Sequence, residues 1–408
     1  MMRRHALAGT LALLNACAGG RPTPEPAAPV RAPAAGVSIG SSSAPVPAPL
    51  PAAAPAAPAP SLARSAVARS WARLDSSSAR IPVFVVTTRR SIASERPGER
   101  FTAYDGDSLQ FATALVNVPS YAVRAQGEIP TPPSTRVNRF WFRPDSGKDM
   151  FVAQLVPHDS SAFVHRVGDD LAGTRSRALL VFIHGYNVGH EDAVLRAAQV
   201  AADVGFDGTI VTFDWPSAGS LGGYVRDQQA ARNAGFHLAQ FFRWISVVVA
   251  PDQLHAIAHS MGSEVLSRAA IALPPDSAAW RFDQVIFAAP DIDARLFRRE
   301  VLPRLTSRAR RVTLYASGDD EALRASRSVN GIWRLGLGGD SLVVLPNMDT
   351  IDATRVRADM LGHTLFVNAG FLSDLALLLA EGKPPAARRL LPVTRDSLVF
   401  WRFRAGAR

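Results

Sequence analysis

The chain has 408 residues, 47% of them hydrophobic, and a formal net charge of +10. Only Lys148 and Lys383 are lysines, so arginines carry almost all of the positive charge, and they are spread through every segment rather than gathered beside aromatic residues. This distribution argues against a nucleic-acid-binding protein, and it is compatible with contacts to anionic lipid headgroups.

The first 17 residues have the order of a secretory signal: two arginines, an apolar run over 6–14, and small residues before Cys17. The apolar run is shorter than the roughly 20 residues needed to cross a bilayer. Cys17 is the only cysteine, and the sequence before it resembles a bacterial lipobox, in which the cysteine is lipidated; a cleaved signal with an incidental cysteine is the alternative. Because Ala18 follows, we expect a cell-envelope protein anchored through lipid to the outer membrane and facing the periplasm.

Residues 18–64 alternate proline with alanine and other small residues. This composition buries too little apolar surface to fold and favours extended polyproline II, so the segment is predicted to be a disordered tether. Residues 65–408 have globular patterning and are predicted to form a single domain.

Apolar, β-branched runs in the first part of this domain predict strands at 81–88, 115–118, 139–142 and 150–156. Beyond residue 175, strands alternate with long helices. The predicted strands are 178–183, 209–213, 254–258, 285–289, 312–316 and 341–345, and the predicted helices are 191–204, 224–249 and 261–272. This alternation predicts an α/β fold with a mostly parallel central sheet and helices on both faces, whose ligands bind at the carboxyl ends of the strands.

One such strand end carries Ala258-His-Ser260-Met-Gly262, followed by a helical segment. The string matches the G-x-S-x-G nucleophile elbow of α/β-hydrolases, with alanine in the first glycine position. Small residues are needed there because the serine lies in a strained turn where strand and helix approach closely. The motif predicts Ser260 as a nucleophile, with the Met261 N–H available to a developing oxyanion.

A second strand ends in His184-Gly-Tyr186-Asn. In α/β-hydrolases the residue after this His-Gly supplies the other oxyanion-hole N–H, which here is Tyr186. His184 precedes the serine in the chain, so we interpret it as a histidine that shapes the loop beside the substrate cleft rather than as the base.

A serine nucleophile needs a histidine base and an orienting carboxylate, in the chain order Ser, Asp or Glu, His. Only His363 follows Ser260. Asp320, and after it Asp319, are the preferred acids because they end a strand between the two; the alternatives are Asp291 and Asp293 after the preceding strand. Helix capping would also explain an aspartate at either place.

No metal site and no cofactor are predicted, because H-E-x-x-H, clustered His and carboxylate patterns and glycine-rich phosphate motifs are missing from the sequence.

Together the motifs resemble the bacterial α/β-hydrolase family of uncharacterised function, within the esterase/lipase superfamily. The resemblance extends over most of residues 80–382 and includes Thr88-Arg-Arg, Phe213-Asp-Trp-Pro-Ser217 and Gly362-His363. It implies the triad Ser260, Asp320 and His363, and Trp215 and Tyr224 beside the cleft.

The expected activity is hydrolysis of small-molecule or lipid esters through an acyl-enzyme. A thioesterase or amidase would use the same path, and a non-catalytic envelope-binding lipoprotein on the same scaffold is the alternative from another class. Fold resemblance alone does not identify a substrate.

Overall fold

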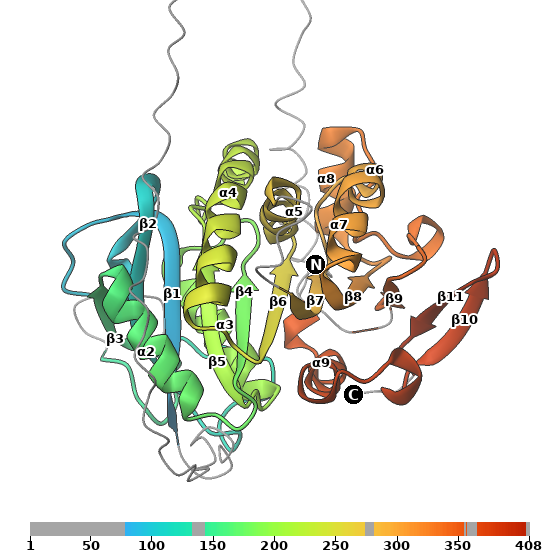
Figure 1. Ribbon diagram of the computed structural model, residues 1–408. Coiled ribbons are helices and arrows are strands. Elements are labelled where there is room, and N and C mark those ends of the chain that lie inside the picture. Colours follow the sequence, from blue (N-terminus) through green and yellow to red (C-terminus); the bar gives the residue numbers. More distant parts are fainter. Residues whose placement is uncertain (1–77, 133–142, 274–280, 355, 357–364, 405–408) are drawn as a thin grey trace, which may run out of the picture. The chain divides into compact units, whose positions relative to one another are not determined.

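The computed structural model describes residues 78–132, 143–273, 281–354, 356 and 365–404. All of these belong to one compact unit, Ala53–Arg408. An 11-stranded sheet lies at its centre (Figure 1). The strands are β1 (Ala79–Ser91), β2 (Phe101–Val118), β3 (Phe151–His158), β4 (Ala178–Ile183), β5 (Gly208–Asp214), β6 (Gln253–His259), β7 (Phe282–Ala288), β8 (Ala309–Ala316), β9 (Asp349–Asp352), β10 (Leu391–Arg395) and β11 (Leu398–Arg402).

The strand order is β10-β11-β9-β8-β7-β6-β4-β5-β1-β2-β3. Every pair from β11 to β1 is parallel, whereas β2 and β3 at one end and β10 at the other are antiparallel to their neighbours. The carboxyl ends of the parallel strands therefore share one edge of the sheet, where ligands bind in such folds.

Helices connect most of the parallel strands and cover the sheet (Figure 1). They are α2 (Ser160–Ala172), α3 (His190–Asp203), α4 (Tyr224–Val248), α5 (Gly262–Ala272), α6 (Ala294–Leu296), α7 (Leu302–Thr306), α8 (Glu321–Asn330) and α9 (Ala369–Glu381). Among these described helices, none combines the length and hydrophobicity needed to span a membrane.

Two hydrophobic cores lie on opposite faces of the sheet. Side chains alternate along β4: Leu179 and Val181 point into the core beneath α2, α4, α5 and α7, while Leu180 and Phe182 point into the core beneath α3 and α9. Because both faces are covered, β4 is buried along its whole length and reads as an unbroken apolar run. The predicted α/β class, with a mostly parallel sheet and helices on both faces, is confirmed.

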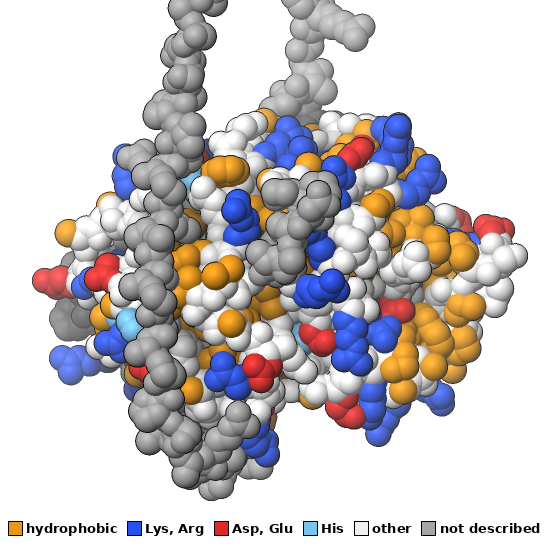
Figure 2. Space-filling view, viewed as in Figure 1, with side chains coloured by type: hydrophobic (Ala, Val, Ile, Leu, Met, Phe, Trp, Pro, Cys, Tyr) orange, Lys and Arg blue, Asp and Glu red, His pale blue; other side chains and the backbone are white. Residues whose placement is uncertain are grey.

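On the described part of the face in Figure 2, the Lys and Arg side chains lie among hydrophobic and uncharged groups rather than in one continuous patch.

One predicted strand is wrong. Residues 341–345 are not a strand: a short 3-10 helix, Gly339–Ser341, is followed by irregular backbone, and the strand of this region is β9. The apolar side chains still pack, since Leu342 is buried and Val343 to Leu345 are half-buried against the core, but no strand in the described part of the chain pairs with them. The predicted strand 139–142 lies outside the described residues.

Other elements differ from or add to the predictions. The predicted strand 115–118 is only the end of the much longer β2, and helix α2 and the β10–β11 hairpin were not predicted. The hairpin turn consists of Asp396 and Ser397, both with positive φ, which is a less frequent pair for such a turn than Asp-Gly.

Candidate active site

Ser260 lies in the turn between β6 and α5, at the carboxyl end of a central strand. Its φ is +53°, the left-handed region that non-glycine residues adopt at a cost of about 1–3 kcal/mol. Neighbouring backbone holds it there: its N–H donates to the Ala288 carbonyl oxygen at 3.0 Å, and its carbonyl oxygen accepts from the Asp291 N–H at 3.0 Å. The strained strand-to-helix turn of a nucleophile elbow is therefore present.

Two glycines allow the elbow to lie against the loop that follows β4. A Cβ on Gly262 would be 2.4 Å from the His184 carbonyl oxygen, and a Cβ on Gly185 would be 2.8 Å from the Ser260 Cβ. Both approaches are shorter than real Cβ contacts, so larger residues cannot enter without displacing backbone. The His-Gly loop and Ser260 are consequently in direct contact.

Gly262→Ala is expected to lower the free energy of unfolding by about 3 kcal/mol, because overpacking a tight site costs about 1–3 kcal/mol and here the obstacle is backbone. Urea denaturation measures this. The matched control is Gly168→Ala inside α2, where a Cβ meets no atom within 4 Å; it should stabilise by up to about 1 kcal/mol. Equal effects of the two substitutions would contradict the packing argument.

The two predicted oxyanion donors belong to the two segments that Gly185 and Gly262 bring together. Within the described part of the chain, neither the Tyr186 N–H nor the Met261 N–H donates to a protein acceptor. The Tyr186 hydroxyl donates to the Leu221 carbonyl oxygen, and burial together with the charge of Asp227 raises its pKa to about 12. The phenol is thus a fixed neutral group, while the backbone N–H remains available.

Asp319 and Asp320, the preferred acids, differ sharply in environment. Asp319 is exposed, whereas Asp320 is fully buried just beyond the carboxyl end of β8. The Asp320 carboxylate caps α8 by accepting from the Leu323 N–H at 2.8 Å. A carboxylate has about four lone-pair sites, so capping α8 does not by itself prevent Asp320 from accepting another hydrogen bond.

Asp291 is occupied by other groups. Its carboxylate accepts hydrogen bonds from the Tyr224 hydroxyl at 2.8 Å and the Ser326 hydroxyl at 2.6 Å, and it pairs with the buried Arg334 at 3.1 Å. Burial and the Asp291 charge raise the pKa of Tyr224. Asp291 thus joins the elbow to α4 and α8.

Asp293, the other alternative acid, caps the short helix α6, because its side chain accepts from the Arg295 N–H at 2.8 Å. It is half-buried. Helix capping accounts for this carboxylate.

His184 and Trp215 are both buried, unlike the half-buried Tyr224. The His184 ring stacks on Trp215 with centroids 5.0 Å apart, and the Trp215 indole donates to the His184 carbonyl oxygen at 2.7 Å. One ring nitrogen of His184 faces the Asp214 carboxylate and the other faces the Gly185 carbonyl oxygen. Neither nitrogen is therefore directed at Ser260, and of the three predicted cleft residues only Tyr224 has appreciable exposed surface.

His363 and Cys17 lie outside the described residues. No contact of the predicted base or of the predicted lipidation site is described.

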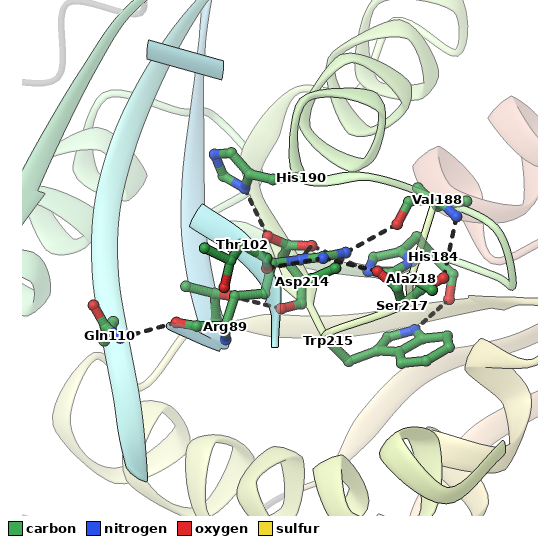
Figure 3. A network of polar contacts seen from close by, with 12 residues as sticks. Arg89, Thr102, Gln110, His184, Val188, His190, Asp214, Trp215, Ser217 and Ala218 are labelled. Atoms are coloured by element: carbon green, nitrogen blue, oxygen red, sulfur yellow. Dashed lines mark hydrogen bonds and ion pairs between the residues drawn. The ribbon is translucent and has the colours of Figure 1, made fainter. Parts of the chain in front are cut away.

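A buried polar network beneath the His-Gly loop was not predicted as part of the site (Figure 3). It centres on the Asp214 carboxylate, which binds Arg89, His184 and His190 at 2.7, 3.1 and 2.7 Å. Burial alone would raise the pKa of Asp214, but Arg89 and the histidines hold it well below its usual range. The sequence feature that could have indicated this network is a charged residue near the end of each of two apolar strands, Arg89 in β1 and Asp214 in β5.

A model of the family described as "Alpha/beta hydrolase of unknown function (DUF900)" matches residues 159–367, just over half of the chain. No curated protein matches.

Two solved structures are similar at low identity. A protein of Lactobacillus plantarum WCFS1, described as a "putative cell surface hydrolase", has a TM-score of 0.33 and 11% identity, covering 52% of this chain and 94% of that one. A Trichoderma reesei cutinase in complex with a phosphonate inhibitor has a TM-score of 0.24 and 14% identity, covering 53% and 90%. Both scores are too low to add to the family match. That match, together with the parallel sheet and the nucleophile elbow, means that the chain belongs to the α/β-hydrolase family of unknown function.

Proposed function

We propose that this α/β-hydrolase is a serine esterase that cleaves carboxylic esters through an acyl-enzyme, with Ser260, His363 and Asp320 as its triad. One observation carries the proposal: Ser260 is held in the left-handed conformation at the elbow, in contact with the loop that carries the Tyr186 N–H. A turn that holds a serine in a strained conformation at the carboxyl edge of the sheet suits a nucleophile.

In the proposed reaction, His363 takes the proton of the Ser260 hydroxyl as Oγ attacks the ester carbonyl carbon. The carbonyl oxygen becomes an oxyanion and accepts hydrogen bonds from the N–H groups of Tyr186 and Met261. The tetrahedral intermediate then expels the alcohol, which leaves with the proton from His363. Water attacks the acyl-enzyme by the same route in reverse, releasing the carboxylic acid and restoring Ser260.

Asp320 is the proposed partner of the His363 imidazole. A buried carboxylate holds the ring in one tautomer and stabilises the imidazolium that forms in the transition state. Asp320 is supported by its complete burial and by its place just beyond the carboxyl end of β8, between Ser260 and His363 in the chain. Asp291 is a weaker candidate because Tyr224, Ser326 and Arg334 already contact its two oxygens.

The test is covalent labelling of the full-length protein with a fluorophosphonate probe, which reacts with activated serines. The wild type should be labelled and Ser260→Ala should not. A panel of p-nitrophenyl esters of graded acyl length, with matching thioesters and amides, then defines the substrate class. Equal labelling of both proteins, or no hydrolysis of any acyl substrate by the wild type, would overturn the proposal.

A further inference from the structure

The loop that carries the Tyr186 N–H, residues 184–189, joins β4 to α3 and has neither helical nor strand structure. Asn187 in its middle has a φ of +58°. Such backbone has no repeating hydrogen bonds of its own to fix it. Catalysis nevertheless requires a fixed loop, because an oxyanion donor must lie 2.7–3.1 Å from the position that the oxyanion will occupy.

Side chains from distant parts of the chain supply the missing hydrogen bonds. The Trp215 indole donates to the His184 carbonyl oxygen at 2.7 Å, and the Ser217 hydroxyl accepts from the Val188 N–H at 3.2 Å. Arg89 donates to the Val188 carbonyl oxygen at 2.9 Å. The backbone of the loop is thus held before and after Tyr186 by groups from β1 and from the segment that begins at the end of β5.

Arg89 and the histidines at the two ends of the loop converge on the Asp214 carboxylate (Figure 3). One oxygen of its carboxylate accepts from Arg89 at 2.7 Å and lies 3.1 Å from the His184 ring; the other lies 2.7 Å from the ring of His190, the first residue of α3. One carboxylate therefore fixes the residues at both ends of the loop. Thr87 adds a hydrogen bond to the Asp214 carbonyl oxygen at 2.7 Å, which joins the ends of β1 and β5.

Arg89 and Asp214 are almost completely buried, with side-chain exposures of 1% and 0%. Besides Asp214, the Arg89 guanidinium donates to the carbonyl oxygens of Thr102, Val188 and Ser217. Apolar residues of similar size often stabilise a fold as well as a buried ion pair does, so stability gives little reason for charges at this place. The rigid Arg89 guanidinium instead donates four directed hydrogen bonds, one to Asp214 and three to backbone carbonyl oxygens, which apolar side chains cannot replace.

We infer that Arg89 and Asp214 are positioning residues that hold the Tyr186 N–H of the oxyanion hole in place, an inference that rests on the proposed esterase function. They act through the loop and touch no substrate. Losing an oxyanion donor costs about 100- to 1,000-fold in kcat, and a displacement of about 1 Å can cost about 100-fold. Replacing Asp214 should therefore lower kcat/KM by about 100-fold and change KM little, because the oxyanion forms only in the transition state.

The experiment compares full-length wild type and Asp214→Asn with two probes. The first is hydrolysis of a p-nitrophenyl ester, measured as kcat and KM separately. The second is inhibition by a short alkyl boronic acid, whose tetrahedral serine adduct places an oxygen in the oxyanion hole. If the loop is misplaced, the inhibition constant should rise by about the factor by which kcat/KM falls.

A second buried pair provides the matched control. Arg124 and Asp203 are 2.7 Å apart with side-chain exposures of 0%, and Asp203 also accepts from the Gly127 N–H and the Gln199 amide. Asp203→Asn should destabilise the protein but leave kcat/KM and the boronate inhibition constant within about threefold, a change of under 1 kcal/mol. A defect equal to that of Asp214→Asn would reduce the role of Asp214 to general stability and overturn the inference.

Ser217→Ala keeps the inference testable if Asp214→Asn does not fold. It removes the hydroxyl that accepts from the Val188 N–H and donates to the Asp227 carboxylate, and it leaves the Arg89–Asp214 pair in place. A folded protein with about tenfold lower kcat/KM and a parallel rise in the inhibition constant is expected. Unchanged values in folded Asp214→Asn, or in Ser217→Ala if Asp214→Asn does not fold, would overturn the inference. The proposed function fails differently, because the wild type itself would then neither hydrolyse the ester nor bind the boronate.

Discussion

Ser260→Ala is expected to lower kcat for a p-nitrophenyl ester by about 10⁴- to 10⁶-fold, because removing a serine nucleophile leaves only the oxyanion hole and substrate binding. The overall fold should be retained, since alanine keeps the backbone bonds of Ser260 to Ala288 and Asp291. Steady-state kinetics at several enzyme concentrations measure the loss. Residual turnover should come from background attack by water rather than from an acyl-enzyme.

Ser263→Ala is the matched control for this substitution. Ser263 lies in the first turn of α5, is buried like Ser260, and its hydroxyl approaches the Ala258 carbonyl oxygen at 3.5 Å. Because this contact is long, its loss should leave kcat within about tenfold. If Ser260→Ala kept kcat within the same range, Ser260 would not be the nucleophile.

Asp320→Asn is expected to lower kcat by about 10⁴-fold, because an amide in place of the orienting carboxylate favours the wrong imidazole tautomer. Asparagine is as good an N-cap as aspartate. It can still accept from the Leu323 N–H, which Asp320 binds at 2.8 Å. The free energy of unfolding should therefore change by less than about 1 kcal/mol, so that the substitution isolates the chemical role.

Two other asparagine variants separate the candidate acids. Asp319→Asn changes the exposed neighbour and should keep kcat within about tenfold. Asp291→Asn disturbs the bonds to Tyr224, Ser326 and Arg334, so it should lower stability by about 3 kcal/mol, as expected when a buried ion pair is broken, with a much smaller loss of kcat than Asp320→Asn. The reverse ranking of kcat between Asp291 and Asp320 would make Asp291 the orienting acid.

Much of the fold could be predicted because its central strands carry local signals. Strand β4 is an apolar run buried on both faces, and its predicted bounds, Ala178–Ile183, match the structure. The predicted helix 224–249 differs from α4 by one residue, since the apolar period continues to its end. Residues 341–345 look like a strand in the sequence, but pairing with a neighbour decides whether a strand forms, and that depends on tertiary structure.

The candidate site also has parts that local sequence predicts and parts that depend on tertiary structure. The strand-to-helix turn at Ser260 could be predicted from the sequence because a strand, small flanking residues and a helix lie within a few positions of it. Asp320 could be preferred from the sequence, but Asp291 could not be set aside, since the two follow neighbouring parallel strands, β8 and β7, and their bonding partners depend on the fold. Arg89 and Asp214 are 125 positions apart and meet only because β1 pairs with β5.

The antiparallel strands at the two ends of the sheet also bear on self-association. An edge strand offers unpaired N–H and C=O groups to which another chain can add a strand. Both outermost strands contain a proline, Pro157 in β3 and Pro392 in β10. Proline has no N–H to donate, and it is a common device at exposed edges. The sheet thus ends at both sides in strands poorly suited to further pairing, which should protect an apolar, largely parallel sheet from edge-to-edge aggregation.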